Sequence, residues 1–496
     1  MSSSSTSGVD PGTGAPLLHT PSGVVSGSWR RHGSGPAVAV FRAVPVSAPH
    51  TDGSAAFAAP RPAPSWPGTL DCPDTEERRG LGATHTATVT CPAESTGGPY
   101  PVMVWVHGGR FETGHADDPR YDATALAAEG CVVVAVNYRK RFEGFLPVGD
   151  SADGDFRGVG DLVASLRWVR DCIGDVGGDV DRVTLAGQSA GGALVAWLLA
   201  DERASGLFHR AVMMSPGAPR RGWSQRRLTT ALALRRWGRR PTAESMASLS
   251  AGELTDAYRR FARFHVTDCA VGVHPFTPSG MRPVPVITGT MHDEFVRFPG
   301  VRQVDAVLRR TLGRAAERLG LPRVAEAWAV APAMLVLGVP VRSVPAWCRS
   351  VSTTTPVRPL GRTVGDRMIR RWASAFAESL ADSGAPVWAY EFRDDARPAQ
   401  HCGELPLLFG TPGGPGGPGT QFRDAVVGFV HGREPDWDRY TVPQRRARVF
   451  DLSGASTAPA RPDQADDPWR DVRTLAGPLY PGTRGTPAGP RVVDGG

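Results

Sequence analysis

The stretch RVTLAGQSAGGALVAWLLA, residues 182–200, joins a strand-like run to a helix-like run through one serine among glycines. The pattern G-x-S-x-G carries little weight by itself, because glycine makes up 59 of the 496 residues. Its surroundings carry more weight, since RVTLAG is apolar like a buried strand and AGGALVAWLLA begins a helix. A strand, a tight turn with a serine and a helix are the setting of a nucleophilic serine. We therefore expect Ser189 to be a nucleophile.

The glycines of this turn have a steric reason. Side chains close to the serine would collide in so tight a turn, and Gly187 and Gly191 remove them. The N-terminus of the following helix would direct partial positive charge toward the serine hydroxyl. The alternative is a glycine-rich strand–helix turn in which the serine is incidental.

Strand-like and helix-like segments alternate along the chain. The strand candidates are short and rich in valine, at 101–106, 131–137, 182–187, 283–289 and 386–392. The helix candidates, at 161–175 and 366–384, carry apolar residues at helical spacing and end at glycines. The first three strand candidates are apolar at consecutive positions, which is typical of inner parallel strands covered on both faces. This alternation predicts a doubly wound α/β domain.

The chain is predicted to consist of three segments, with insertions in the middle one. Residues 1–20 are predicted to be a flexible N-terminus, 21–452 a single α/β domain, and 453–496 a Pro/Gly-rich tail that is loose or disordered. Residues 216–282 and 296–346 are predicted to be mostly helical or irregular insertions that cover one edge of the sheet. A helix pair is expected within 302–331, and the run 410–420 is expected to be a flexible loop.

A nucleophilic serine needs a base, and the base needs an acid to orient it. Asp293 and Glu294 follow the strand candidate 283–289, and His401 follows the strand candidate 386–392. Open α/β sheets place their sites beyond the strand ends, where these residues are expected. The rival histidines are His292, which precedes the acid pair, His209, and His431, which lies in a helix-like run and is interpreted as a packing or surface residue.

A second glycine turn follows the strand candidate 101–106. In VMVWVHGGRF, residues 102–111, two glycines allow backbone N–H groups to turn toward a substrate. Such donors stabilise an oxyanion in the transition state, and losing one typically costs about 3–4 kcal/mol. The alternative is an ordinary glycine turn after a strand.

Composition excludes several classes of function. The formal net charge is +7, but nearly all basic residues are arginines and the RR pairs are scattered, so nucleic-acid binding is not expected. No apolar run approaches ~20 residues, so no membrane span is expected. The start MSSSSTSGVDPGTGAP lacks a basic flank and an apolar run, so no secretory signal is expected. The seven widely spaced cysteines suggest neither zinc nor disulfides, and we expect a cytoplasmic protein.

Taken together and in order, these motifs resemble the type-B carboxylesterase family, which includes para-nitrobenzyl esterases and cholinesterases. The resemblance runs from about residue 20 to 452. It rests on FRAVPVSAP (41–49), VMVWVHGGRF (102–111), VVVAVNYR (132–139), SLRWVRDCIGDVGGDVDRVTLAGQSAGG (165–192), LFHRAVMMSPG (207–217), MHDEF (291–295), QHCGELPLLFG (400–410) and RRARVFD (445–451). It implies an α/β-hydrolase fold, with a mostly parallel central sheet flanked by helices and helical insertions before and after the acid.

The resemblance also implies catalytic roles. Ser189 is expected to be the nucleophile, Glu294, the second acid of the pair, to orient the base, and His401 to be the base. The implied reaction is ester hydrolysis through an acyl-enzyme, with a small-molecule ester as substrate and without a cofactor or metal. A monomer is favoured.

The resemblance places the oxyanion donors on the backbone N–H groups of Gly109, Arg110 and Ala190. Ser215, in MMSPG, resembles a serine that lies near the acid without touching the substrate.

Several positions depart from the pattern of the family. Arg110 stands at the third position of H-G-G-G/A, and Gln188 stands where a glutamate usually precedes the serine. Thr84 replaces a cysteine, so the paired-cysteine loop is expected to be shortened and unbridged. Phe295 follows the acid and Cys402 follows the base where glycines are usual. These residues indicate a divergent member with altered pocket walls.

Three interpretations remain open from the sequence. The first is an active serine esterase. The second is an acyltransferase or a lactone-, amide- or carbamate-directed hydrolase on the same three residues, since any nucleophile that reaches the acyl-enzyme can capture it. The third is a non-catalytic interaction protein of the same fold.

Overall fold

The structure is a computed structural model. It describes residues 14–475 except for 50–52, 79–84, 94–98, 150–154, 236–240, 267, 275–279, 299, 321–323, 353–357, 395–396, 411–416 and 454–463. Thr84 lies outside these residues, as does most of the loop predicted at 410–420.

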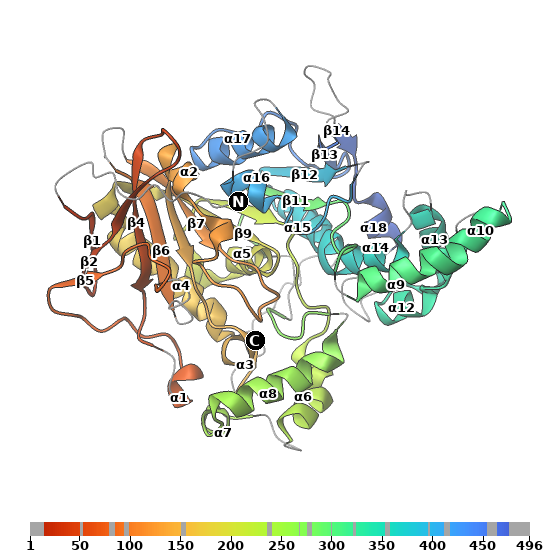
Figure 1. Ribbon diagram of the computed structural model, residues 1–496, viewed down its shortest axis with the longest axis horizontal. Coiled ribbons are helices and arrows are strands. Elements are labelled where there is room, and N and C mark those ends of the chain that lie inside the picture. The colour runs from red at the N-terminus through yellow and green to blue at the C-terminus, as the bar shows by residue number, and fades with distance from the viewer. Residues whose placement is uncertain are drawn as a thin grey trace, which may run out of the picture.

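A large mixed sheet forms the centre of the molecule (Figure 1). Its order is β14-β13-β12-β11-β10-β9-β7-β8-β6-β4-β3. In chain order its strands are β3 (Ser28–Arg31), β4 (Ala37–Pro45), β6 (Thr86–Pro92), β7 (Tyr100–Val106), β8 (Val132–Val136), β9 (Gly178–Gln188), β10 (Arg210–Met214), β11 (Val286–Met291), β12 (Val387–Arg393), β13 (Arg446–Asp451) and β14 (Gln464–Asp466). The neighbouring strands β8, β7, β9, β10, β11, β12 and β13 pair in parallel. The pairs nearer the edges, β13–β14 on one side and β8–β6, β6–β4 and β4–β3 on the other, are antiparallel. The predicted α/β fold with a mostly parallel sheet is confirmed.

The inner strands are buried on both faces, as their unbroken apolar runs predict. Along β7, Val102, Val104 and Val106 belong to one hydrophobic cluster, whereas Met103 and Trp105 belong to another. Successive side chains of a strand point to opposite faces, so the two clusters lie on opposite sides of the sheet. The same alternation holds along β8. All five strand candidates from the sequence correspond to strands of this sheet.

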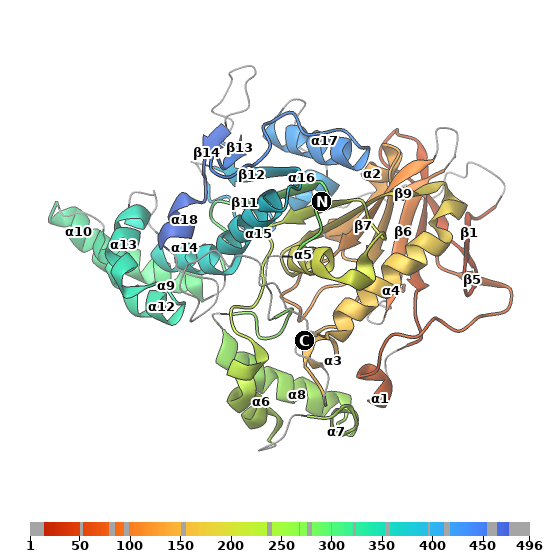
Figure 2. The same ribbon diagram turned by 180° about the vertical axis from the view of Figure 1, so that it is seen from behind.

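Helices cover both faces of the sheet (Figures 1 and 2). Helices α4 (Arg157–Cys172), α5 (Ala190–Ala200) and α15 (Arg371–Asp382) contribute to the cluster that contains Val104. Helices α2 (Thr124–Ala128), α16 (Leu405–Phe409) and α17 (Pro418–Val430) contribute to the cluster that contains Trp105. The helix predicted at 161–175 corresponds to α4, and the helix predicted at 366–384 corresponds to the π-helical turn η9 (Asp366–Arg370) and α15.

Two groups of helices project from the sheet (Figure 1). They correspond to the two insertions predicted to be mostly helical, but they lie in separate places and not together over one edge of the sheet. The first contains α6 (Arg227–Leu234), α7 (Ala243–Ala247) and α8 (Ala251–Ala262). The second, called the distal lobe here, contains α9 (Val301–Leu308), the π-helical turn η7 (Arg309–Gly313), α10 (Arg314–Arg318), α11 (Val324–Trp328), α12 (Ala331–Val336), α13 (Val344–Ser352) and α14 (Pro359–Gly365). A separate hydrophobic cluster that includes Met334, Trp347 and Cys348 lies within the distal lobe.

The remaining elements lie at the periphery. A small sheet contains β1 (Leu17–Thr20), β2 (Gly23–Ser26) and β5 (Thr69–Asp71). The short helices are α1 (Gly53–Ala56), α3 (Arg141–Phe145) and α18 (Arg470–Leu475).

Two segments expected to be loose contain ordered elements. Residues 17–20 form β1, which pairs with β2. Beyond residue 452, β14 pairs with β13, and α18 follows Trp469, which is fully buried and donates its indole N–H to Thr290 Oγ1 at 3.0 Å. The expectation of a loose tail therefore does not hold for residues 464–475. The signal available in the sequence was a tryptophan, Trp469, within a segment rich in proline and glycine, because tryptophan side chains are mostly buried on average.

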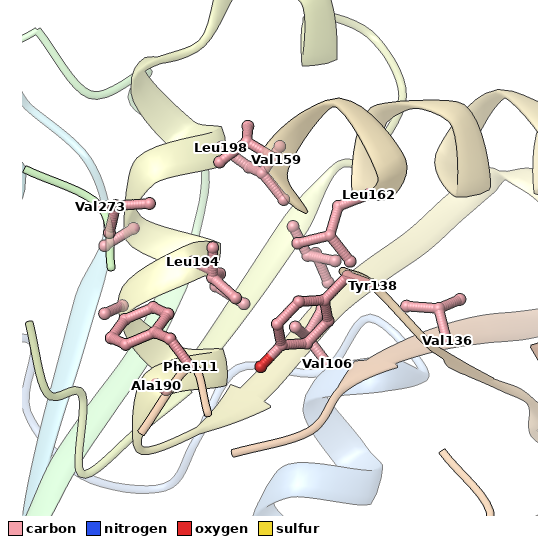
Figure 3. Close-up of a cluster of buried hydrophobic side chains, with 14 of the residues drawn as sticks. Val106, Phe111, Val136, Tyr138, Val159, Leu162, Ala190, Leu194, Leu198 and Val273 are labelled. Carbon is pink, nitrogen blue, oxygen red and sulfur yellow. The ribbon is translucent and has the colours of Figure 1, made fainter. Parts of the chain in front are cut away.

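Close packing surrounds the turn between β9 and α5 (Figure 3). Ala190, Leu194 and Leu198 lie along α5, and Val159 and Leu162 of α4 pack beside them. This contact positions the start of α5 at the carboxyl end of the sheet.

The pair Gly289–Tyr390, between β11 and β12, gives a stability prediction. A Cβ atom at Gly289 would lie 2.3 Å from the ring of Tyr390, which is fully buried. We expect Gly289→Ala to lower the free energy of unfolding by about 1–3 kcal/mol, the usual range for an overpacked core. Urea unfolding measures this change as a lower midpoint at an unchanged slope.

The matched control is Gly174→Ala, because a Cβ atom there meets nothing within 4 Å. An unfolding midpoint for Gly289→Ala equal to that of the control would contradict the packing argument.

Candidate active site

The turn after β9 holds Ser189 in a strained conformation. Its φ is 58° and its ψ is −122°, values that a residue with a side chain rarely adopts. A Cβ atom at Gly191 would lie 2.0 Å from the Val106 carbonyl oxygen, and one at Gly187 would lie 2.7 Å from the Gly191 carbonyl carbon. The predicted steric reason for both glycines is thus visible in the packing.

Backbone hydrogen bonds hold this turn in place. The N–H of Ser189 donates to the carbonyl of Met214 at the end of β10 at 2.9 Å. The carbonyl of Ser189 accepts from Ala193 at 3.1 Å and from Gly217 at 3.0 Å. The serine is largely buried, with 8% of its surface exposed.

The segments after β11 and β12 bring an acid and a histidine to the serine. Nε2 of His401 lies 2.9 Å from Ser189 Oγ, and Nδ1 lies 2.5 Å from Glu294 Oε2. Because a carboxylate only accepts, Nδ1 carries the proton and Nε2 is free to accept the serine hydroxyl proton. The other oxygen of Glu294 accepts the N–H of Met291 at 2.9 Å, which orients the carboxylate. Ser189, His401 and Glu294 therefore form one continuous hydrogen-bonded chain.

Asp293 and the rival histidines take no part in the hydrogen bonds that join Ser189, His401 and Glu294. Asp293 Oδ2 is 3.3 Å from Nδ1 of His292, and the His292 ring lies beside the guanidinium of Arg362. His209 accepts the N–H of Val183 at 3.3 Å, and His431 is the residue after α17. The sequence left the choice between Asp293 and Glu294 to the resemblance, and the geometry brings Glu294 to His401.

A second buried carboxylate, which the sequence analysis did not assign, lies behind the histidine. Glu404 is fully buried and accepts the hydroxyl of Ser215 at 2.9 Å. Burial, together with the charge of Glu294, raises the pKa of Glu404 to about 7. The signal available in the sequence was the short spacing, since Glu404 follows His401 by only three residues.

The charge around His401 favours its protonated form. Burial alone lowers the pKa of an imidazole, but the carboxylates of Glu294 and Glu404 outweigh it and hold the pKa of His401 above its usual value. Phe295 stacks on the imidazole with ring centroids 5.1 Å apart and covers one face of it.

The turn after β7 faces the start of α5. Gly109, Arg110 and Phe111 all have positive φ, at 121°, 58° and 63°. Within the described residues, the N–H groups of Gly109 and Arg110 form no backbone hydrogen bond. Ala190 is the first residue of α5, so its N–H has no partner inside that helix.

Neighbouring aromatic groups support this turn. Tyr138 donates its hydroxyl to the carbonyl of His107 at 2.9 Å and stacks on the His107 ring. Nδ1 of His107 lies 2.7 Å from the carbonyl of Gly108, so it carries the proton and donates. Burial, with the charge of Lys140, holds the pKa of His107 well below its usual value, so the ring is neutral.

The side chain of Arg110 lies along the wall of the site. Its Nη2 donates to the carbonyl of Asp268 at 3.0 Å, and its guanidinium lies over the Phe298 ring at 5.6 Å. Phe298 in turn meets Phe295, with centroids 5.3 Å apart. The altered wall predicted from Arg110 and Phe295 is therefore a continuous surface of one guanidinium and two rings.

Two further departures from the family pattern, Gln188 and Cys402, contact each other beside His401. Gln188 Nε2 is 3.4 Å from His401 Nε2, and the thiol of Cys402 lies 3.5 Å from Gln188 Oε1. Cys402 has a φ of 67° and is one of seven free cysteines. The side chain that precedes Ser189 is thus neutral and close to His401.

A search of the described residues finds no group of three or more His, Cys, Asp or Glu side chains able to hold a metal ion. The same part of the chain contains no helix long and apolar enough to cross a membrane.

A sequence model of the carboxylesterase family matches residues 86–425. The chain is 30% identical over 407 residues to a probable N-octanoylanthranilate hydrolase of Rhodococcus erythropolis, covering 74% of this chain and 80% of that protein. It is 30% identical over 441 residues to the fumonisin B1 esterase of Sphingopyxis macrogoltabida, covering 80% of this chain and 75% of that protein. It is 30% identical over 410 residues to the para-nitrobenzyl esterase of Bacillus subtilis, covering 75% of this chain and 79% of that protein.

Solved structures agree with these relatives. A PNB esterase matches with a TM-score of 0.68 and 26% identity, covering 94% of this chain and 100% of that chain. A Geobacillus stearothermophilus carboxylesterase matches in fold with a TM-score of 0.69 and 24% identity, covering 92% and 99%. The protein belongs to the carboxylesterase family, with the α/β-hydrolase fold, and is a carboxylic ester hydrolase.

Proposed function

We propose that Ser189 is the nucleophile of ester hydrolysis, that His401 is its general base, and that Glu294 orients His401. The observation that carries this proposal is the chain of two hydrogen bonds, 2.9 Å from Ser189 Oγ to Nε2 and 2.5 Å from Nδ1 to Glu294. Both distances lie within the reach that proton transfer and orientation require.

The oxyanion is proposed to bind to the backbone N–H groups of Gly109, Arg110 and Ala190. The absence of a backbone partner for the first two N–H groups among the described residues, and the position of the third at a helix start, support this role. The positive φ values of the turn after β7 store strain there, which is common where backbone donors are held in place for a substrate.

The proposed reaction has two halves. In the first, His401 Nε2 takes the hydroxyl proton while Ser189 Oγ attacks the ester carbonyl carbon. The tetrahedral oxyanion collapses, the carbon–oxygen bond to the alcohol breaks, and the alcohol leaves with the proton from His401. In the second, His401 takes a proton from water, the resulting hydroxide attacks the acyl carbon, and Ser189 leaves with that proton as the acid is released.

The substrate is proposed to be a small-molecule carboxylic ester, bound against the wall formed by Arg110, Phe295 and Phe298. The relatives named above act on a para-nitrobenzyl ester and on fumonisin B1, which supports this range. A cytoplasmic location is proposed from the seven free thiols, six of which are buried. A monomeric state and the lack of nucleic-acid binding stay predictions.

The Ser189→Ala variant tests the nucleophile. We expect kcat/KM for a p-nitrophenyl ester to fall by at least about a thousandfold, because no other hydroxyl occupies that position. A fluorophosphonate probe should label the parent at Ser189, as located by mass spectrometry, and should not label the variant. Ser248→Ala, at an exposed position after α7, is the control and should keep both properties. Labelling of another residue in the parent would contradict the assignment.

The adjacent acids give a matched pair of variants. We expect Glu294→Gln to lower kcat by about 10⁴-fold, because an amide no longer holds the imidazole in the required tautomer. Asp293→Asn, one residue away and paired with His292, should stay within about tenfold of the parent. Steady-state kinetics on one neutral ester compares the two variants, and an equal loss in both would reject the choice of Glu294.

The charge of Glu404 gives a pH prediction. The base must be neutral, so kcat/KM falls on the acid side as His401 becomes protonated. Where Glu404 is ionised its carboxylate raises the pKa of His401, and because Glu404 itself has a pKa of about 7 the two groups titrate together. Removing that charge in Glu404→Gln should lower the pKa of His401 and leave one titrating group on the acid side. The acid limb of kcat/KM should therefore move to lower pH, while the amide still accepts from Ser215.

Profiles of kcat/KM against pH with a neutral ester measure this shift. Glu244→Gln, which removes a carboxylate from an exposed position on α7, is the control and should leave the limb unchanged. A shift of the Glu404→Gln limb to higher pH, or no shift, would show that Glu404 does not act on His401.

A further inference from the structure

The positive charge of the chain is concentrated in one segment. Residues 296–358 contain ten arginines against three acidic residues, a formal charge of +7, which equals the net charge of all 496 residues. The rest of the chain is therefore neutral overall. RR pairs are scattered along the sequence, but the excess charge belongs to the distal lobe, at the right of Figure 1.

A cavity of about 470 Å³ lies in this lobe, and arginines dominate its lining. Five of them contribute to it: Arg297, Arg302, Arg309, Arg310 and Arg358. The one carboxylate in the lining is Asp305. We call this cavity the basic pocket.

The fold explains why these side chains converge. Arg302, Asp305 and Arg309 follow at i, i+3 and i+7, so they share one face of α9 and its continuation. The π-helical turn η7, which begins at Arg309, adds a residue per turn and lets Arg310 line the same cavity. Arg297 comes from the segment after the acid Glu294, and Arg358 immediately precedes α14.

The acid in the pocket does not pair with these arginines. Asp305 is buried and accepts the N–H groups of Leu360 and Gly361, each at 2.9 Å, at the start of α14. Its charge is thus used to hold α14 against α9. Among the described residues, none of the five guanidinium groups donates a hydrogen bond or forms an ion pair within 4 Å.

Like charges therefore face one another across the pocket. Burial, with the nearby charges of Arg297 and Arg309, outweighs the opposing charge of Asp293 and lowers the pKa of Arg358. Arg297, Arg302, Arg309 and Arg310 are exposed, so solvent reaches their guanidinium groups. A bound anion would relieve the repulsion and would replace that solvent with charged acceptors.

We propose that the basic pocket is a binding site for a small polyanion that carries two or more phosphate groups. A guanidinium group can bind two phosphate oxygens at once with paired hydrogen bonds. The positive charge of five guanidinium groups is larger than the negative charge of one carboxylate, so a ligand with several negative charges fits the pocket. The volume falls in the range of sites for small molecules, about 300–1,000 Å³.

This site is distinct from the candidate active site. Neither Ser189 nor His401 nor Glu294 lines it. The segment after β11 separates the two, since Phe295 stacks on His401 whereas Val296 and Arg297 line the pocket. The inference therefore stands independently of the catalytic roles proposed above.

Calorimetric titration of the full chain with inorganic pyrophosphate at low ionic strength tests the proposal. The variant Arg302→Gln/Arg309→Gln removes two charges from the pocket, and Arg314→Gln/Arg318→Gln removes two from exposed positions of α10 outside it. We expect the pocket pair to weaken pyrophosphate binding by about tenfold or more and the control pair by less than about threefold. Hydrolysis of a neutral ester should stay within about twofold of the parent in both, because none of these side chains touches Ser189 or His401.

Vesicle sedimentation distinguishes the sources of the phosphate groups. Binding to cardiolipin vesicles, in which each lipid headgroup carries two phosphate groups, would identify lipid headgroups as the source if it is lost in the pocket pair and displaced by pyrophosphate. Pyrophosphate binding without sedimentation would identify a free phosphate compound. Absence of pyrophosphate binding would overturn the proposal. An equal loss of affinity in the two variant pairs would also overturn it, because the overall positive charge of the lobe, and not the pocket, would then account for the binding.

Discussion

The close approach of α5 to β7 is the constraint on which the rest of the site depends. The Gly191 backbone lies so near the Val106 carbonyl that a single methyl group would collide with it. This contact forces the chain to turn sharply after β9 and holds Ser189 at a φ that costs free energy. The hydrogen bond that Ser189 donates to the Met214 carbonyl, and those that it accepts from Ala193 and Gly217, offset that cost and fix the residue at the carboxyl end of the sheet. The large buried sheet beneath it makes the arrangement rigid, because its inner strands are packed on both faces.

Parallel strands then bring distant segments of chain to the same edge. β10, β11 and β12 lie side by side next to β9, so the segments that follow them meet around the serine. Glu294 and His401 come from the loops after β11 and β12, more than a hundred residues from each other and from Ser189. Buried charge completes the site, since Glu294 and Glu404 both lie behind His401 and act on its protonation. The same loop that supplies Glu294 continues into the basic pocket, so the distal lobe and the catalytic face share one segment of backbone.

The departures from the family pattern affect the walls of the site more than its centre. Arg110 keeps a backbone N–H free while its guanidinium is held by the Asp268 carbonyl and the Phe298 ring. Phe295 replaces a small residue with a ring that covers the imidazole. Gln188, where the family usually has a glutamate, places a neutral amide next to Ser189 and near His401. Together these residues lie around Ser189 and His401 and leave the hydrogen bond between them in place.

The sequence by itself determined the α/β architecture, the inner strands and the serine turn, because each depends on local features: consecutive valines, helical spacing and glycines where side chains cannot fit. It also located both candidate acids and His401 beyond strand ends. Only the tertiary structure decided that Glu294 rather than Asp293 meets His401, because both residues follow the same strand and the path of the backbone selects between them. The order of residues 464–475, the burial of Glu404 and the convergence of five arginines also required the fold. Each is a contact between segments far apart along the chain, and the composition of any one segment does not reveal such contacts.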